Sequence, residues 1–380
     1  MARDRPNPTP LRELATLFVR LGATAFGGPA AHIAMMEDEV VRRRGWMSRE
    51  EFLDLLGATN LIPGPNSTEM AIHVGHRRAG FPGLLVAGVA FIIPAVVIVT
   101  AIAWGYVTYG RLPAAEGLLR AVKPVVIAVV VQALVGFART AVRTVPLAFV
   151  AAAAAAASAA GGNELLVLAA AGAVVAASKL VRRDPDAARG FLPMLPPLVM
   201  GAAAAVPFSM SQLFLVFLKI GSVLYGSGYV LLAFLRSDLV ERLGWLSESQ
   251  LLVAVAVGQV TPGPVFTTAT FIGYVLGGSG GAALATIGIF LPAFVFVALS
   301  GPLVRHVRSS RLAGAFLDGV NVASLALMAV VSVQLARSAV TDVATGALAL
   351  ASAVLLFRFR VNSSWLVAAG AAIGILLLAP

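Results

Sequence analysis

The chain contains no cysteine, which excludes disulfide bonds, thiolate metal sites and cysteine nucleophiles. Its four histidines form no HExxH or similar cluster, so we expect no resident metal and no cofactor. A nucleotide-binding P-loop is also missing, so we do not expect ATP to drive the protein directly. Because the sequence shows neither a nucleophile nor a metal cluster, it disfavours an enzyme.

Charged residues are scarce as well. Only 12% of the residues are charged, about half the fraction usual in soluble domains, while 59% are hydrophobic and the mean hydropathy is +0.91. A helix needs roughly 20 apolar residues to cross the hydrocarbon core of a bilayer. The sequence therefore predicts an all-α, multi-pass membrane protein that has the lipid bilayer as a partner. Uncharged stretches long enough for this cover residues 79–110, 144–163, 190–218 and 249–304.

The net charge of +10 comes mostly from basic residues in short loops between apolar runs. In that position they act as topology signals, so we expect no binding of nucleic acid. The polar segment 1–10 lacks the apolar core and cleavage site of a signal peptide, and the first apolar helix should be retained.

Two copies of one module make up the chain. Matching residues lie about half a chain apart, which indicates a first repeat at 1–181, a cytoplasmic linker at 182–192 and a second repeat at 193–380. One residue, Glu69, has no counterpart in the second copy. The matches include Gly22 with Gly221, Gly45-Trp46 with Gly244-Trp245, Pro63-Gly64-Pro65 with Pro262-Gly263-Pro264, and Pro94-Ala95 with Pro292-Ala293.

Each copy predicts the same series of helices. A first helix (about 11–36, and about 206–235) is interrupted at 26–29 or 225–228, and two short helices joined by Pro-Gly-Pro follow. Ser48 and Ser247 each fit the capping box that starts a helix. Four long apolar helices complete the first copy, near 80–109, 114–138, 145–160 and 165–180. We therefore expect about five spanning helices plus one broken short-helix pair in each repeat.

An odd number of spans turns the second copy upside down, so we expect inverted-topology repeats. This arrangement puts Arg42 to Arg44 and the linker on one face and Arg12 on the other, with both termini outside. The first face then carries more basic residues, and the positive-inside rule makes it cytoplasmic.

The Pro-Gly-Pro turns are the best candidate for a binding site. Pro63 ends one short helix, and Pro65 suits the start of the next. A helix start with free N–H groups attracts anions. The alternative is a plain surface turn between two helices. The residues expected to bind here are Asn60, Pro63, Gly64, Pro65, Asn66, Ser67 and Thr68, and in the second copy Gln259, Thr261, Pro262, Gly263, Pro264, Thr267 and Thr268.

Among the ionisable residues within apolar segments, three are candidate functional residues. Arg20 and Lys219 occupy equivalent positions just before the break of each first helix. If both face the centre, they would neutralise a dianion; the alternative is that each reaches the membrane surface. Glu69 follows the first turn directly. It could carry a proton or act as a gate, or it could pair with Arg77 or Arg78.

Phe26-Gly-Gly-Pro, Gly45-Trp46, Asn60 through Pro-Gly-Pro-Asn66 and the second Pro262-Gly-Pro resemble the chromate ion transporter family in its long, two-domain form. The resemblance implies two domains of opposite orientation and export of chromate, a divalent tetrahedral oxyanion, which would give a bacterium chromate resistance. It also implies roles in transport for the Pro-Gly-Pro region and for the glycines of the first helix: Gly27, Gly28 and Pro29, with Gly226 in the second copy.

We therefore expect a secondary active transporter in the bacterial inner membrane. Transport of sulfate or another oxyanion, and a passive anion channel, remain as alternatives. The sequence leaves open whether the protein is a monomer or a homo-oligomer.

Overall fold

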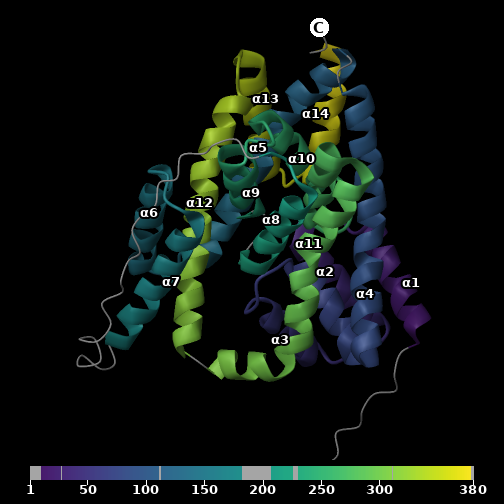
Figure 1. The fold of residues 1–380 in the computed structure, drawn as a ribbon, viewed down its shortest axis with the longest axis vertical. Coiled ribbons are helices and arrows are strands. Elements are labelled where there is room, and N and C mark those ends of the chain that lie inside the picture. Colours follow the sequence, from purple (N-terminus) through teal and green to yellow (C-terminus); the bar gives the residue numbers. More distant parts are fainter. Residues whose placement is uncertain are drawn as a thin grey trace, which may run out of the picture.

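The computed structural model describes residues 10–26, 28–110, 113–181, 207–225, 230–309 and 311–377, and these residues form helices joined by short connections (Figure 1). The predicted linker 182–192 and the predicted site residues Gly27 and Gly226 lie outside the described residues. The all-α prediction is confirmed for the described part of the chain.

The helices of the two halves correspond one to one. The first half contains α1 (Leu11–Thr24), α2 (Gly28–Glu37), α3 (Arg49–Thr59), α4 (Asn66–Tyr109), α5 (Pro113–Ala141), α6 (Val145–Ala159) and α7 (Glu164–Val181). The second contains α8 (Met210–Val223), α9 (Leu231–Leu235), α10 (Glu248–Val260), α11 (Thr268–Ser309), α12 (Arg311–Ala339), α13 (Val343–Arg358) and α14 (Ser363–Leu377). Equivalent π-helical turns, Asp38–Arg43 and Arg236–Arg242, follow α2 and α9.

The first predicted helix does not cross the molecule but folds back at its break. Arg44, just after α2, places its Nε 3.7 Å from Oε1 of Glu13 in the first turn of α1. The start of α1 therefore lies at the same end of the molecule as Arg42 to Arg44. The prediction that the N-terminal end and these arginines lie on opposite faces is wrong, because apolar composition does not distinguish a hairpin from a span.

The two short helices around Pro-Gly-Pro form a second hairpin. Arg77 Nε lies 2.5 Å from Glu51 Oε1, and Arg78 donates a 3.0 Å hydrogen bond to the carbonyl of Trp46. The chain then reverses within α4, where Ala79 and Gly80 leave helical geometry and Gly80 has φ +63°. Gly277 and Gly278 break α11 in the same way. The first segment of α4 is thus a short helix, as the sequence predicts.

Fewer helices are long enough to cross a bilayer than the sequence predicts. Among the described residues, four stretches qualify by length and composition: Asn66–Tyr109, Gly117–Ala141, Val265–Ser300 and Leu312–Ala339, and in the first and third of these the breaks at Gly80 and Gly278 leave only the longer second segment to cross. The expected five spans per repeat, and the parity argument that depends on them, are therefore not supported. The reason is length: α6, α13 and α14 have only 15, 16 and 15 residues, and α1 turns back.

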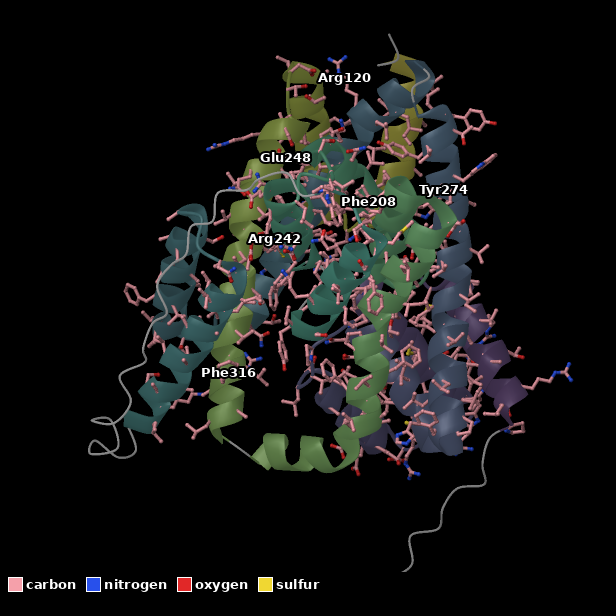
Figure 2. All side chains as sticks on the ribbon, in the orientation of Figure 1. Arg120, Phe208, Arg242, Glu248, Tyr274 and Phe316 are labelled. Atoms are coloured by element: carbon pink, nitrogen blue, oxygen red, sulfur yellow. The ribbon has the colours of Figure 1, made fainter. Side chains whose placement is uncertain are left out.

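The two halves are interlocked. The short pair α6 and α7 packs against α12 of the second half, and α13 and α14 pack against α5 of the first. Helices α4 and α11 pack against each other, while α1 covers α4 and α8 covers α11. In Figure 2, Arg120 near the start of α5 lies at the upper end, and Phe316 near the start of α12 lies toward the lower end.

Candidate functional site

The two Pro-Gly-Pro turns and the two helix breaks meet inside the molecule. The N–H of Gly64 donates to the carbonyl of Leu224 (2.9 Å), and the N–H of Gly263 donates to the carbonyl of Ala25 (3.0 Å). Ala25 and Leu224 are equivalent positions, each at the C-terminal end of the half-helix before its break. Each turn is therefore held by the hairpin tip of the other half, and the two contacts are reciprocal.

Glycine is favoured in both turns by its backbone conformation, and at Gly263 also by close packing against α1 and α4. Gly64 and Gly263 have φ +144° and +88°, a region that disfavours residues with a Cβ. A Cβ on Gly64 would lie 3.7 Å from Cβ of Ala293, and one on Gly263 would lie 2.9 Å from Cβ of Ala95. Ala95 and Ala293 are the equivalent alanines of α4 and α11, so the crossing of these long helices backs the turns.

The first turn exposes polar groups. Asn66, the first residue of α4, donates a 2.8 Å hydrogen bond from Nδ2 to Oδ1 of Asn60, which is exposed. The N–H groups of Thr68 and Glu69 donate to the carbonyl of Pro65 (2.8 and 3.0 Å), so those of Asn66 and Ser67 are the ones this helix start offers to a ligand. Ser67 and Thr68 are buried, and Oγ1 of Thr68 makes no hydrogen bond. The predicted donors of the first copy therefore lie together at one tip.

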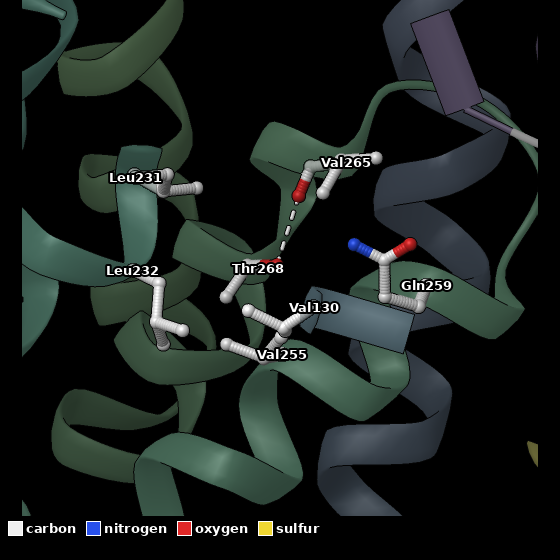
Figure 3. A pocket seen from close by; sticks show the side chains of 7 residues that line it. All are labelled: Val130, Leu231, Leu232, Val255, Gln259, Val265 and Thr268. Carbon is white, nitrogen blue, oxygen red and sulfur yellow. Dashed lines mark hydrogen bonds between the residues drawn. The ribbon is translucent and has the colours of Figure 1, made fainter. Parts of the chain in front are cut away.

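The second turn is closed. Residues 261–268 are all buried. The hydroxyls of Thr261, Thr267 and Thr268 each donate a 2.8 Å hydrogen bond to a carbonyl of their own segment. Beside Thr268 and Gln259 lies a cavity of about 10 Å³ (Figure 3), which is room for about one water molecule. The threonine hydroxyls are thus already used, and this cavity is too small for a tetrahedral oxyanion.

Arg20 and Lys219 are both ion-paired. Arg20 pairs with Glu39, and Lys219 Nζ donates to Oδ1 of Asp238 at 2.7 Å. Glu39 and Asp238 are themselves equivalent in the repeat. Burial alone would raise the pKa of Glu39, but hydrogen bonds from Arg44 and Arg20 outweigh it and lower the pKa. The carboxylate therefore stays ionised and balances much of the charge of Arg20.

An open cleft of about 570 Å³ lies beside the first pair. Arg20 and Glu39 line it, together with Arg42, Arg43 and Thr24. Thr24 directly precedes Ala25, whose carbonyl receives the N–H of Gly263. The cleft therefore reaches the C-terminal end of α1, and none of the described residues that line it belongs to the second turn.

The glycine motif of the first helix forms the start of α2. Gly28 begins this helix with φ +77°, and Pro29 is half-buried beside it. One turn later, Nε2 of the buried His32 lies 3.0 Å from the carbonyl of Ala25. The same carbonyl receives Gly263, so His32 supports the contact between the halves. Sequence reasoning gave His32 no role, and its only signal was a histidine one turn after the break.

Glu69 lies at the centre of this arrangement and is fully buried. Neither carboxylate oxygen makes a hydrogen bond. Its Oε1 is the atom closest to a Cβ placed on Gly64, so the carboxyl group rests against the first turn. Tyr225, at the break of the second copy, is near enough to interact with it electrostatically. The alternative of an ion pair between Glu69 and Arg77 or Arg78 does not occur in the structure.

Comparison with known proteins gives the family. The model of the chromate transporter family matches residues 12–177 and again residues 211–375. The chain belongs to the chromate transporter family. The same family model thus matches the chain twice, once in each half. The predicted linker 182–192 lies between the two matched regions and belongs to neither.

Named relatives cover most of the chain. A chromate transport protein of Cupriavidus metallidurans is 31% identical over 96% of this chain and 92% of the relative. A chromate transport protein of Pseudomonas aeruginosa is 31% identical over 87% of this chain and 82% of the relative. A probable chromate transport protein of Synechococcus elongatus is 29% identical over 88% of this chain and 87% of the relative. No solved structure matches significantly. This family member is thus a multi-pass membrane protein with an inorganic anion as the expected substrate.

Proposed function

We propose that the protein is a secondary active transporter that exports chromate from the bacterial cytoplasm across the inner membrane and so confers chromate resistance. The family match and the printed names of three relatives support chromate as the substrate. The observation that carries the transport mechanism is the reciprocal contact of the two Pro-Gly-Pro turns with the opposite helix breaks.

The direction follows from the charge of the substrate. Moving one elementary charge across 100 mV is worth about 2.3 kcal/mol, so a dianion leaves an inside-negative cell with about 4.6 kcal/mol per 100 mV in its favour. No ATP is needed for that step, in keeping with the lack of a P-loop.

The proposed architecture is a pair of inverted repeats. An isologous contact, in which each partner gives the other the same group, is what a two-fold axis produces. The paired hydrogen bonds of Gly64 and Gly263 have this form, and the equivalent helices α5 and α12 start at opposite ends (Figure 2). The first segment of α4 and helix α1 have about 14 residues each, or roughly 20 Å at 1.5 Å per residue. Their tips would therefore lie near the middle of the bilayer.

The proposed anion site lies at the tip of the first copy. It comprises the N–H groups of Asn66 and Ser67 at the start of α4, the side-chain amides of Asn60 and Asn66, and the hydroxyls of Ser67 and Thr68. Asn60 accepts from Asn66, so its own NH₂ group is a donor for the anion. Gln259 and the second turn would join when the second tip opens, since its threonine hydroxyls are used in this conformation. Arg20 and Lys219 would attract the anion only weakly because they are ion-paired.

Flux into inside-out vesicles tests the export. Vesicles that contain the protein should accumulate chromate under an inside-positive potential, and vesicles without it should not. Uptake that does not depend on the protein would refute the proposal. An excess of sulfate tests the alternative substrate, because sulfate has the same charge and shape. Currents far above carrier turnover would instead indicate a passive channel.

The natural lack of cysteine makes the inversion directly measurable. Glu50 and Ser249 occupy equivalent, exposed positions at the starts of α3 and α10. We expect a membrane-impermeant maleimide to label Ser249→Cys in intact cells, and Glu50→Cys only after permeabilisation. Labelling of both variants from one side would rule out inverted repeats.

A further inference from the structure

The first segment of α4 carries three titratable residues on one helical face. Glu69, His73 and His76 follow one another at spacings of four and three residues, which places them in one row along the helix. Exposure increases along the row: Glu69 is 0% exposed, His73 is 6% exposed, and His76 is exposed at the end of the segment. The row thus leads from the hairpin tip to the surface.

Two members of the row have unused polar atoms. Both oxygens of Glu69 and Nε2 of His73 are buried without a hydrogen bond. A buried polar atom without a partner costs stability, so such atoms are rare in folded proteins. His73 and His76 also interact electrostatically. A rise of about 6 Å separates residues four apart in a helix, a distance that one bridging water can connect.

The second copy lacks the row completely. Glu69 has no counterpart there, and Phe271 and Tyr274 take the places of His73 and His76. The segment begins instead with the 3₁₀ turn Val265–Thr267, whose larger rise per residue covers the distance with one residue fewer. A structural role common to both tips would not explain a feature that only one copy has.

Within the part of the chain that the structure describes, the neighbouring elements bring no cation to Glu69. On α1, Glu13 is near Arg44 and Arg20 pairs with Glu39; on α3, Glu51 pairs with Arg77. His32 of α2 contacts the carbonyl of Ala25, and α11 presents Ala293 beside the turn. At the opposite tip, the titratable side chain of Tyr225 interacts electrostatically with Glu69. An ionised Glu69 would therefore be a buried charge without a counter-ion, so in this conformation the group is neutral.

From this placement we propose that Glu69 is a proton-binding site, that His73 and His76 connect it to the face of the first copy, and that the proton and the anion bind together. The inference rests on the anion site proposed above. A carboxylate beside the first turn would repel a dianion, whereas the protonated acid donates a hydrogen bond to it. Anion binding therefore favours the proton, and proton binding favours the anion.

Proton uptake by the purified, full-length protein tests this directly. We add chromate to the protein in weakly buffered detergent solution, follow a pH dye, and subtract a protein-free blank that contains chromate's own buffering. At a pH above the pKa that Glu69 has in the anion-free protein, the wild type should take up close to one proton per bound anion, and below that pKa, where Glu69 is already protonated, it should take up none. Above the pKa of Glu69, the affinity of the protein for chromate should decrease as the pH rises. The decrease should approach a factor of ten per pH unit, which is the limit for one linked proton. Release of protons on binding, or no uptake at any pH, would overturn the inference.

Variants assign the effect to the row. Glu69→Gln should bind chromate without proton uptake and without the pH dependence. Full uptake in this variant would contradict the role of Glu69. His73→Phe and His76→Tyr reproduce the second copy, and they should slow proton uptake while leaving the equilibrium affinity at high pH unchanged. Proton uptake at the wild-type rate in both variants would contradict the proposed role of the two histidines.

Two measurements keep the test decisive. If Glu69→Gln does not fold, infrared difference spectra of the wild type replace it: a protonated-carboxyl band must be present and must shift on addition of chromate. Absence of that band overturns the inference without any variant. A wild type that binds no anion at any pH refutes the proposed function as well, whereas anion binding without proton uptake at every pH refutes only the inference.

Discussion

The contact between the halves predicts a large effect from one methyl group. In Gly263→Ala, the new Cβ would lie 2.8 Å from the carbonyl oxygen of Gly22 and 2.9 Å from Cβ of Ala95, whereas carbon contacts are normally about 3.5–4.0 Å. Gly22 cannot retreat, because it packs directly on the backbone of Phe91 in α4. The turn must therefore move and weaken its 3.0 Å hydrogen bond to Ala25.

The magnitude is the sum of two costs. A left-handed conformation costs a non-glycine residue about 1–2 kcal/mol, and overpacking costs about 1–3 kcal/mol. We expect Gly263→Ala to lose about 2–5 kcal/mol of stability and most of its chromate flux. Thermal unfolding in detergent and the vesicle assay measure the two effects.

Two control variants separate these costs. Gly161 has φ +83° with no atom within 4 Å of an added Cβ, so Gly161→Ala should carry only the conformational cost and keep its flux. Gly105 has free space and no positive φ, so Gly105→Ala should be neutral or slightly stabilising. If Gly263→Ala melts and transports like Gly105→Ala, the packing argument is refuted.

Two further predictions concern ion pairs. Lys219→Met should destabilise the protein by about 2–4 kcal/mol, because the side chain of Asp238 is 3% exposed and would retain the ion pair with Arg242. Arg20→Met should cost under about 1 kcal/mol, because Arg43 and Arg44 still pair with Glu39. Equal melting temperatures of the two variants would contradict this prediction. Arg120, with the N–H of Thr345, lowers the pKa of Asp342 at the start of α13. That contribution is present above the unfolded-state pKa of about 4 and is lost as the pH falls below it, so Asp342→Asn, which keeps the cap, should reduce the acid sensitivity of the melting temperature.

Local structure was predictable because its causes are local. Ser48 accepts from the N–H of Glu51, and Ser247 forms the full capping box with Gln250. Pro65 stands directly before the first turn of α4, as its missing N–H requires. The glycine pairs that recur in the sequence also recur as contacts: Gly22 packs on Phe91 and Gly221 on Ile289, at equivalent backbone atoms.

Direction through the membrane was not predictable, because it depends on contacts between distant residues. A helix of 14 residues has the same apolar composition whether the chain then continues or turns back. The first hairpin brings Glu13 to Arg44 and the second brings Glu51 to Arg77, contacts between distant residues that no periodicity reveals. The ion pairs of Arg20 and Lys219 did have a sequence signal, since Glu39 and Asp238 are equivalent residues of opposite charge. Reading each cation alone missed its partner.

The difference between the two tips has a consequence for energetics rather than for direction. A carrier cannot choose a direction through its own asymmetry, because binding energies on the two sides cancel over a full cycle. The potential sets the direction through the net charge that moves. A dianion alone gains about 4.6 kcal/mol per 100 mV, and a dianion with one proton gains about 2.3 kcal/mol. A proton site present in one copy only would therefore halve the electrical driving force for export and add a dependence on the pH gradient, both measurable as flux at fixed potential.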